Sequence, residues 1–430
     1  MIRTFALSGL GSALSIAIYG LFIFTVGVGA KSDSFFAVLA VTQTIGTILF
    51  APYETFVQRF SLDRLRSGEE PAWPLLISYL CLSLATLLPY YALGERILGP
   101  LFAGAYTREP ALWRYHFYVL GALIPLTGVV AIMQVYCQAR GRYDLPKVAL
   151  VVGRLVGILV FLVVRSRQPQ AISVAIVLSP AVASTICWKG SRIAGTNVAS
   201  VFGGLRSVFL QWFSVSKWGV VLKTDALVER ILAAHVTTGF LSLFSLGWSA
   251  VMSIVDAYQS SYVVADSNRY YQNCGASAGT KGRTLLISEY RRSSVAALWL
   301  TGVVVLASLG ALGLLWAKGW GLSVSGRITS GEVGLLVTTL ILATYILCIW
   351  KQFAGMYTIQ DRAVAFAKYL TLVYLCLVGP RIALTWAWGA IGFCAGLLGY
   401  YGAQVLMLGH SLPARLSSAR ATAPDTSGAG

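Results

Sequence analysis

The chain has 430 residues, of which 57% are hydrophobic and only 11% are charged. Soluble domains carry roughly 25% charged and about 45–50% apolar residues, so this composition excludes an ordinary soluble globule, a disordered chain and a nucleic-acid-binding protein. The formal net charge of +17 falls mostly between apolar blocks, where it is expected to report membrane topology and contact with anionic lipid head groups.

Apolar blocks of about 20 residues recur along the chain, and this is the length that crosses the core of a bilayer as a helix. They predict an all-α, polytopic membrane protein with twelve transmembrane helices. The expected spans are 5–29, 35–57, 72–94, 113–138, 147–164, 171–188, 208–233, 237–264, 294–317, 333–357, 364–380 and 383–408. The intervening segments are too short for an extramembrane domain, and residues 411–430, rich in Ser, Ala, Gly and Pro, predict a disordered cytoplasmic tail.

The loop cations predict which way the chain crosses the membrane. One set of alternate loops carries 18 Lys and Arg residues, whereas the other set, which includes Arg381, carries 8. Because positively charged loops stay in the cytoplasm, both termini are expected there.

A weak internal repeat relates the two halves of the chain. The segment that begins Asp33-Ser34-Phe35 resembles the segment that begins Thr237-Thr238-Gly239, and each follows an apolar block across a tight outer turn. The repeat predicts an N-lobe over 1–190 and a C-lobe over 191–410, each with six helices, around a central cavity. Transporters whose halves rock against each other are built in this way.

Charge at membrane depth costs at least a few kcal/mol unless it is paired or hydrated, so charges inside spans mark candidate pathways. The candidate substrate-binding cations are Arg154, Lys217, Lys223, Arg230 and Lys351. The candidate ion-coupling carboxylates, for H⁺ or Na⁺, are Glu54, Asp225, Glu229 and Asp256. The alternative interpretation is structural, with Glu54 or Asp256 paired to Lys351 or Arg154.

The span 208–233 is the most polar of the twelve. On a regular helix Lys223 and Arg230 lie about 20° apart, whereas Asp225 and Glu229 lie about 40° apart on a nearly opposite face. We therefore expect one face to point cations into a cavity and the other to pair with a neighbouring helix, although a salt-bridged structural helix fits the same pattern.

Several soluble-enzyme signals are absent from the sequence. No P-loop or CxxC motif occurs, and the three histidines lie far apart, so we expect no ATP hydrolysis, catalytic residue, metal site or cofactor beyond a coupling ion. The pairs Gly153/Gly157 and Gly392/Gly396 predict close helix packing. Prolines 89, 125 and 180 are expected to kink their spans.

Three short motifs carry a family resemblance. Asp33-Ser34-Phe35-Phe36 resembles the Asp-Ala-Phe-Phe signature of MurJ/MviN-type lipid flippases, and 225–234 resembles the start of their second lobe. Residues 138–142 resemble the loop after helix 4 of polysaccharide exporters. The chain thus resembles the multidrug/oligosaccharidyl-lipid/polysaccharide (MOP) exporter superfamily. The resemblance implies two six-helix lobes around a cation-lined cavity, working by alternating access without an ATPase.

The resemblance also implies a function. It points to a monomeric flippase in the bacterial cytoplasmic membrane, surrounded by lipids, that carries an undecaprenyl-pyrophosphate-linked glycan. The twelve spans and the lack of arginine in 15–30 depart from the MurJ type, so either lipid II or another polysaccharide repeat unit remains open as the glycan. Two alternatives are an ion-coupled multidrug antiporter and a polyprenyl-dependent glycosyltransferase or polymerase, although the outer loops 95–112 and 318–332 are short for such an enzyme.

Overall fold

The computed structural model describes residues 2–66, 72–139, 142, 144–164, 169–191, 221–259, 292, 295–303, 306, 328–359 and 363–418. All of the elements in these ranges are helices. The N-terminal half contains α1 (Ile2–Val26), α2 (Ala30–Arg66), α3 (Ala72–Leu98), the short η1 (Pro100–Phe102) and α4 (Ala103–Tyr106), α5 (Pro110–Leu120), α6 (Leu123–Ala139), α7 (Asp144–Val164) and α8 (Ala171–Ser191). The C-terminal half contains α10 (Asp225–Val236), α11 (Phe240–Tyr258), α14 (Ser330–Ile359) and α15 (Ala363–Ser418).

The helices have the length and composition of membrane spans. Within the described ranges, 8 helical stretches are long and apolar enough to cross a membrane, and α11 supplies a shorter apolar helix. This agrees with the predicted all-α, polytopic fold class. Of the predicted spans, 208–233 and 294–317 lie partly outside the described residues.

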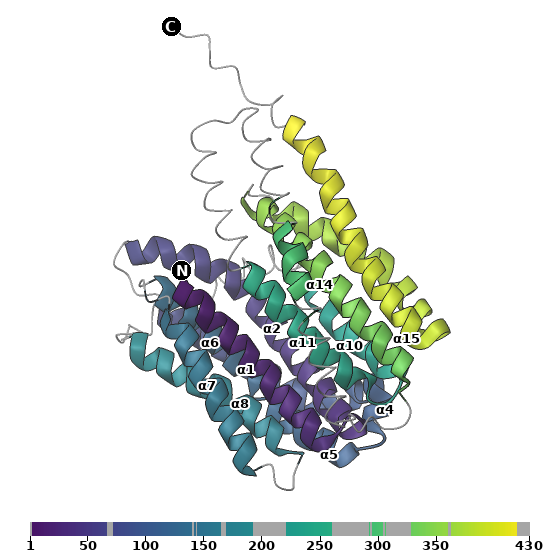
Figure 1. Ribbon diagram of the computed structural model, residues 1–430. Coiled ribbons are helices and arrows are strands. Elements are labelled where there is room, and N and C mark those ends of the chain that lie inside the picture. Colours follow the sequence, from purple (N-terminus) through teal and green to yellow (C-terminus); the bar gives the residue numbers. More distant parts are fainter. Residues whose placement is uncertain are drawn as a thin grey trace.

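The two halves of the chain lie side by side (Figure 1). In the N-terminal half α7 packs on α8 and α1, and α6 packs on α2 and α8. In the C-terminal half α15 packs on α14 and α10. The long helices α1 and α2 make the main contacts with the other half, against α10 and α11. Many of the side chains at the boundary between the halves therefore come from these four helices.

The predicted span 113–138 corresponds to one apolar stretch, Pro110–Gln134, that is long enough to cross a membrane. Its helix is interrupted at Gly121 and Ala122, which separate α5 from α6. Pro125 lies in the first turn of α6, where its missing N–H leaves no helical hydrogen bond unmade. The proline therefore starts a new helix, whereas we expected it to kink a continuous one.

The predicted boundary between the last two spans, at 380–383, is also wrong. The chain continues as helix to a break at Gly389, whose φ of 54° and ψ of −125° reverse its direction within α15. Arg381, which we placed in an outer loop, lies inside the first arm of this hairpin and is only 3% exposed. A charged residue between apolar segments usually lies in a loop, but here buried residues of opposite charge pair with Arg381.

Glycines bring the two arms of α15 together. A β-carbon at Gly392 would overlap the backbone carbonyl of Leu384, and one at Gly396 would press on Arg381. The pair therefore packs helix against helix, as predicted, and it fixes the position of the Arg381 backbone.

The other predicted glycine pair acts in the same way in the N-terminal half. Gly153 and Gly157 of α7 face the carbonyls of Ser179 and Ala175 on α8, and neither glycine has room for a β-carbon. Close approach of backbones replaces the hydrophobic driving force that membrane helices lack between themselves.

Replacement of Gly392 tests this packing. Gly392→Ala should destabilise the protein by about 1–3 kcal/mol, because the backbone of Leu384 has to move away from the added methyl group. The thermal midpoint of the detergent-solubilised protein, followed by fluorescence-detected size exclusion, measures the effect. Gly399→Ala is the matched control, since nothing lies within 4 Å of a β-carbon there. An equal midpoint for both variants would contradict the packing argument.

Candidate functional site

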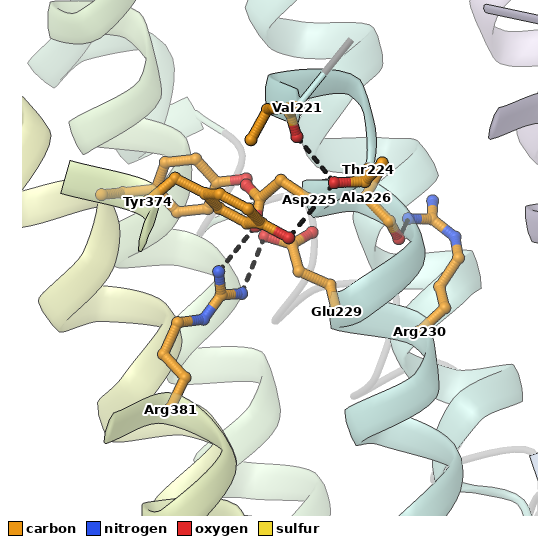
Figure 2. Close-up of polar contacts among 9 residues, drawn as sticks. Val221, Thr224, Asp225, Ala226, Glu229, Arg230, Tyr374 and Arg381 are labelled. Atoms are coloured by element: carbon orange, nitrogen blue, oxygen red, sulfur yellow. Dashed lines mark hydrogen bonds and ion pairs between the residues drawn. The ribbon is translucent and has the colours of Figure 1, made fainter. Parts of the chain in front are cut away.

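Three charged side chains form an ion cluster inside the C-terminal half (Figure 2). The guanidinium of Arg381 on α15 donates from Nη1 to Asp225 Oδ1 at 2.6 Å and from Nη2 to Glu229 Oε1 at 3.3 Å. Asp225 and Glu229 are 7% and 1% exposed. They are four residues apart on α10 and so lie on one face, as the helical geometry predicts. The facing surfaces of α10 and α15 are thus both charged, and each charged side chain pairs with one of opposite sign.

Tyrosines surround the cluster and hydrogen-bond its carboxylates. The Tyr401 hydroxyl donates to Glu229 Oε1 at 2.8 Å. Tyr400 hydrogen-bonds Asp225, and its ring lies 4.4 Å from the Arg381 guanidinium carbon. A cation over an aromatic face gains further stabilisation when it is desolvated. The cluster is therefore built into the helix packing.

A second polar group lies at the boundary between the halves. Arg230 follows Glu229 directly but projects away from Arg381 (Figure 2), with Nη1 donating to the Ala226 carbonyl at 2.9 Å. Arg230 is partly exposed and is in electrostatic contact with Tyr19 of α1. The two successive residues of α10 thus face different surroundings: a sealed cluster and the inter-half boundary.

Arg154 reaches the same tyrosine from the N-terminal half. It lies on α7, is partly exposed, and contacts α1 at Gly11, where a β-carbon would collide with its guanidinium. Tyr19 is in electrostatic contact with both Arg154 and Arg230 and hydrogen-bonds Gln43 of α2. One guanidinium from each half therefore interacts electrostatically with the same tyrosine. We call Tyr19, Arg154 and Arg230 the arginine pair site.

Further charges lie at the end of the bundle where α7 begins. Asp256 of α11 interacts electrostatically with Lys351 of α14 and with Lys147 of α7, and the positive charge of Arg154 repels that of Lys147. The pairing of Asp256 with Lys351 is one of the alternatives that the sequence left open. Lys147 and Arg154 are seven residues apart, so they lie on one face of α7.

Lys223, Lys217 and Glu54 are the remaining sequence candidates. Lys223 is partly exposed and precedes a turn at Thr224, whose hydroxyl donates to the Val221 carbonyl at 2.6 Å. Thr224 has helical backbone dihedrals (φ −74°, ψ −17°), and the 20° register between Lys223 and Arg230 stays a prediction. Lys217 lies outside the described residues. Glu54 lies on α2, and its side chain is outside the described part of the chain.

At the opposite end of the bundle a carboxylate joins the two halves. Asp33, near the start of α2, accepts hydrogen bonds from the Gly239 N–H at 2.6 Å, the Ser242 N–H at 3.0 Å and the Ser242 hydroxyl at 2.5 Å. Gly239 and Ser242 lie in the first turn of α11, so Asp33 caps a helix of the other half. We call this contact the Asp33 latch.

The latch depends on the residues around it. Gly239 has a φ of 92°, a conformation that favours glycine, and this turns its N–H toward the carboxylate. The Ser242 hydroxyl also lies 2.9 Å from that of Ser32. The segments that start at Asp33 and at Thr237 are the two that the internal repeat relates, and the structure brings them together.

Sequence reasoning missed three residues of these groups. Arg381 was assigned to a loop, Lys147 was counted as a loop cation, and Tyr19 carries no charge. Only Arg381 could have been suspected from the sequence, because two carboxylates inside one span, Asp225 and Glu229, require a cation on a neighbouring helix.

Removal of the Arg381 side chain should destabilise the protein. Arg381→Ala leaves two buried carboxylates without their cation, and breaking a buried pair costs about 3–5 kcal/mol, so we expect a lower thermal midpoint and less protein in the membrane. Arg381→Met combined with Asp225→Asn and Glu229→Gln should recover most of the loss. Arg114→Ala is the control, since its pair with Glu95 is 59% exposed on the arginine side and surface ion pairs contribute little to stability. Equal losses in Arg381→Ala and Arg114→Ala would show that the cluster has no structural importance.

Removal of the Asp33 latch should open the end of the bundle that holds it. Charge-assisted hydrogen bonds contribute about 1.5–3 kcal/mol, so Asp33→Ala should raise the open population about tenfold or more. In a cysteine-free background, labelling of Tyr19→Cys by an impermeant maleimide from the predicted outer side should then accelerate. Ser34→Ala is the neighbouring control, because its hydroxyl donates to Ala105 within the same half. Unchanged labelling in Asp33→Ala would contradict the latch.

Comparison with known proteins supports the fold. The sequence matches no protein-family model and no curated protein. The structure is similar to that of the lipid II flippase MurJ in an inward closed conformation, with a TM-score of 0.71 and 14% identity over 96% of this chain and 87% of that chain. It is also similar to an inward-facing multidrug resistance MATE family transporter of the MOP superfamily (TM-score 0.64, 13% identity, 95% of this chain and 96% of that chain). A third similar structure is the eukaryotic MATE transporter AtDTX14 (TM-score 0.60, 15% identity, 95% and 93% covered). The chain is a multi-pass membrane protein with the fold of MOP-superfamily transporters.

Proposed function

We propose that this protein is a flippase that moves an undecaprenyl-pyrophosphate-linked glycan across the bacterial cytoplasmic membrane by alternating access. It acts as a monomer among membrane lipids, with both termini in the cytoplasm and without enzymatic chemistry. The observation that carries the proposal is the arginine pair site, in which Arg154 and Arg230 approach Tyr19 from the two halves of the chain.

The chemistry of the arginine pair site suits a diphosphate. A guanidinium donates two parallel hydrogen bonds to phosphate oxygens, and Arg is more weakly hydrated than Lys, so it is favoured where water is scarce. Each half contributes one guanidinium, so a bound diphosphate would hold the halves together at this depth. Tyr19 adds a hydroxyl that is already oriented by Gln43.

The charged residues at the other end of the bundle would extend the route that the substrate follows. Lys147 and Lys351 come from different halves and share Asp256 as a counter-ion. We assign them to the cytoplasmic entrance, where a diphosphate would compete with Asp256 for both ammonium groups. The Asp33 latch lies at the opposite end and would close the outer side while the lipid-linked substrate enters.

Movement needs an energy source, and the buried carboxylates are the candidates for coupling to H⁺ or Na⁺. Asp225 and Glu229 lie on the same helix as Arg230, so a change in their charge would be felt directly at the arginine pair site. Asp256 and Glu54 lie toward the predicted cytoplasmic ends of their helices and are the secondary candidates.

The second candidate function is an ion-coupled multidrug antiporter. The buried acidic pair and the similarity in fold to multidrug resistance transporters favour it. The arginine pair site weighs against it, because two guanidiniums at the boundary repel the cationic compounds that an acidic cavity would attract. The glycan attached to the lipid carrier is left open between lipid II and a polysaccharide repeat unit.

Loss of either arginine should slow flipping. A charge-assisted contact contributes about 1.5–3 kcal/mol, so Arg154→Ala and Arg230→Ala should each weaken binding of fluorescent undecaprenyl diphosphate about tenfold or more. Arg154→Lys should recover only part of the loss, since an ammonium cannot donate in a fork. Flipping in proteoliposomes of matched protein content measures the effect.

The control is Lys368→Ala, which removes an exposed cation of α15 outside the arginine pair site. Its flipping rate should equal that of the unmodified protein. Normal flipping by both arginine-to-alanine variants would overturn the proposal. Export of a cationic dye by the same proteoliposomes, without flipping, would favour the antiporter.

A further inference from the structure

An exposed ion pair joins α3 to α5 near one end of the bundle. Glu95 lies in the last turn of α3, and its Oε1 accepts hydrogen bonds from Arg114 Nε of α5 at 2.6 Å and from the Tyr106 hydroxyl of α4 at 3.0 Å. Both charged residues lie within about one helical turn of the ends of the apolar stretches that contain them, Leu76–Leu98 and Pro110–Gln134. The pair therefore lies at the depth of a membrane–water interface.

The pair leaves hydrogen-bonding groups of both partners available to a ligand. The hydrogen bonds that the described residues make to Glu95 fall on Oε1, so none of those residues bonds to Oε2. The Arg114 side chain is 59% exposed, and its neighbours are Glu95 and Tyr106. A guanidinium has several N–H donors, so donors remain on its terminal nitrogens for a phosphate. An acceptor and a set of donors thus lie next to each other on the surface.

One turn deeper in the membrane, two tyrosines continue the same surface. Tyr91 precedes Glu95 by one turn of α3, and Tyr118 follows Arg114 by one turn of α5. Their rings stack with centroids 5.6 Å apart and an angle of 21° between planes, and the Tyr91 hydroxyl donates to the Tyr118 carbonyl at 3.1 Å. Tyrosine is enriched at this depth, because its ring is apolar and its hydroxyl is polar. The two tyrosines fix the spacing of α3 and α5 beneath the ion pair.

Deeper still, α3 presents an apolar stripe. Leu88 and Leu84 precede Tyr91 by about one and two helical turns, so they lie on the face of α3 that carries Tyr91 and Glu95. Both leucines are exposed. From Leu84 to Glu95 the stripe is about 16 Å long, which is about half the thickness of the hydrocarbon core of a bilayer. The order of charged, aromatic and aliphatic side chains therefore matches the depth profile of one leaflet.

We call this surface the lipid site, and its residues are Leu84, Leu88, Tyr91, Glu95, Arg114 and Tyr118. We propose that the lipid site binds one molecule of phosphatidylethanolamine in the leaflet on the predicted outer side. The lipid phosphate binds the terminal nitrogens of Arg114, the primary ammonium binds Glu95 Oε2, and an acyl chain lies along the two leucines. This proposal does not depend on the proposed flippase function.

The two charges select the class of lipid. Arg114 and Glu95 present one positive and one negative group next to each other, and a zwitterionic head group presents the complement, a phosphate and a cation joined by two carbons. An anionic head group lacks the cation and brings its negative charge close to Glu95, which is unfavourable. A choline head group has the cation but no N–H to donate to Oε2. Ethanolamine supplies both the charge and the donors.

A lipid bound here would join three elements of the N-terminal half. The carboxylate of Glu95 on α3 already accepts from Tyr106 of α4 and from Arg114 of α5, and α4 lies with α5 at one end of the bundle (Figure 1). The lipid would therefore hold the ends of these helices together from the membrane side. Because a ligand that binds only the folded state stabilises it, phosphatidylethanolamine should raise the thermal midpoint of the protein.

Native mass spectrometry of the purified full-length protein, with one lipid class added at a time, measures the preference. The unmodified protein should retain phosphatidylethanolamine about fivefold more tightly than phosphatidylcholine or phosphatidylglycerol, as expected for exposed ionic contacts. Arg114→Ala should lower its retention to the level of the other two lipids. Glu95→Gln keeps an acceptor for Tyr106 and should remove only the preference for ethanolamine over choline.

Arg96→Ala is the matched control, because Arg96 is exposed at the same end of α3 but points about 100° away from Glu95. It should retain the three lipids as the unmodified protein does. The thermal midpoint is the second measurement: phosphatidylethanolamine should raise it in the unmodified protein and in Arg96→Ala, but not in Arg114→Ala.

Three results would overturn the proposal. The first is equal retention of the three lipid classes by the unmodified protein. The second is an unchanged preference for phosphatidylethanolamine in Arg114→Ala. The third is a dimer that Tyr118→Ala dissociates, since this would assign the surface to a second copy of the chain.

Discussion

Charge carried at the depth of a membrane must be paired or hydrated, and this constraint determines how the C-terminal half is built. Arg381 and the carboxylates of Asp225 and Glu229 satisfy one another between α10 and α15. Their pairing fixes the rotation of α10 about its axis. Because Glu229 faces the cluster, the next residue, Arg230, faces the boundary between the halves. The ion cluster thus orients Arg230, whose guanidinium points away from the cluster.

The boundary between the halves is polar at both ends and at its centre. At one end, Asp33 of α2 hydrogen-bonds the start of α11. At the other end, Asp256 interacts electrostatically with Lys351 of its own half and with Lys147 of the other half. Between them lie Arg154 and Arg230. Polar contacts of this kind can be exchanged for contacts with a ligand, whereas the glycine-lined packing within each half cannot. Under the proposed function, such an exchange would let the halves move as units in alternating access.

The Asp33 latch joins the two segments that resemble each other in sequence. They lie against each other at one end of the bundle, where Asp33 caps α11. One segment supplies the carboxylate and the other supplies the N–H groups.

The sequence by itself determined the all-α membrane fold, the relation between Asp225 and Glu229 on one helical face, and the close packing at the glycine pairs. These are local properties, because hydropathy, helical periodicity and the absence of a side chain act over a few turns of one helix. Only the tertiary structure showed that Arg381 lies inside a helix and that Tyr19 joins Arg154 to Arg230. The partners of Arg381 are more than 150 residues away in the chain, and its charge alone is typical of a loop. Which cation neutralises which carboxylate depends on how helices pack, and no periodicity within one helix records that.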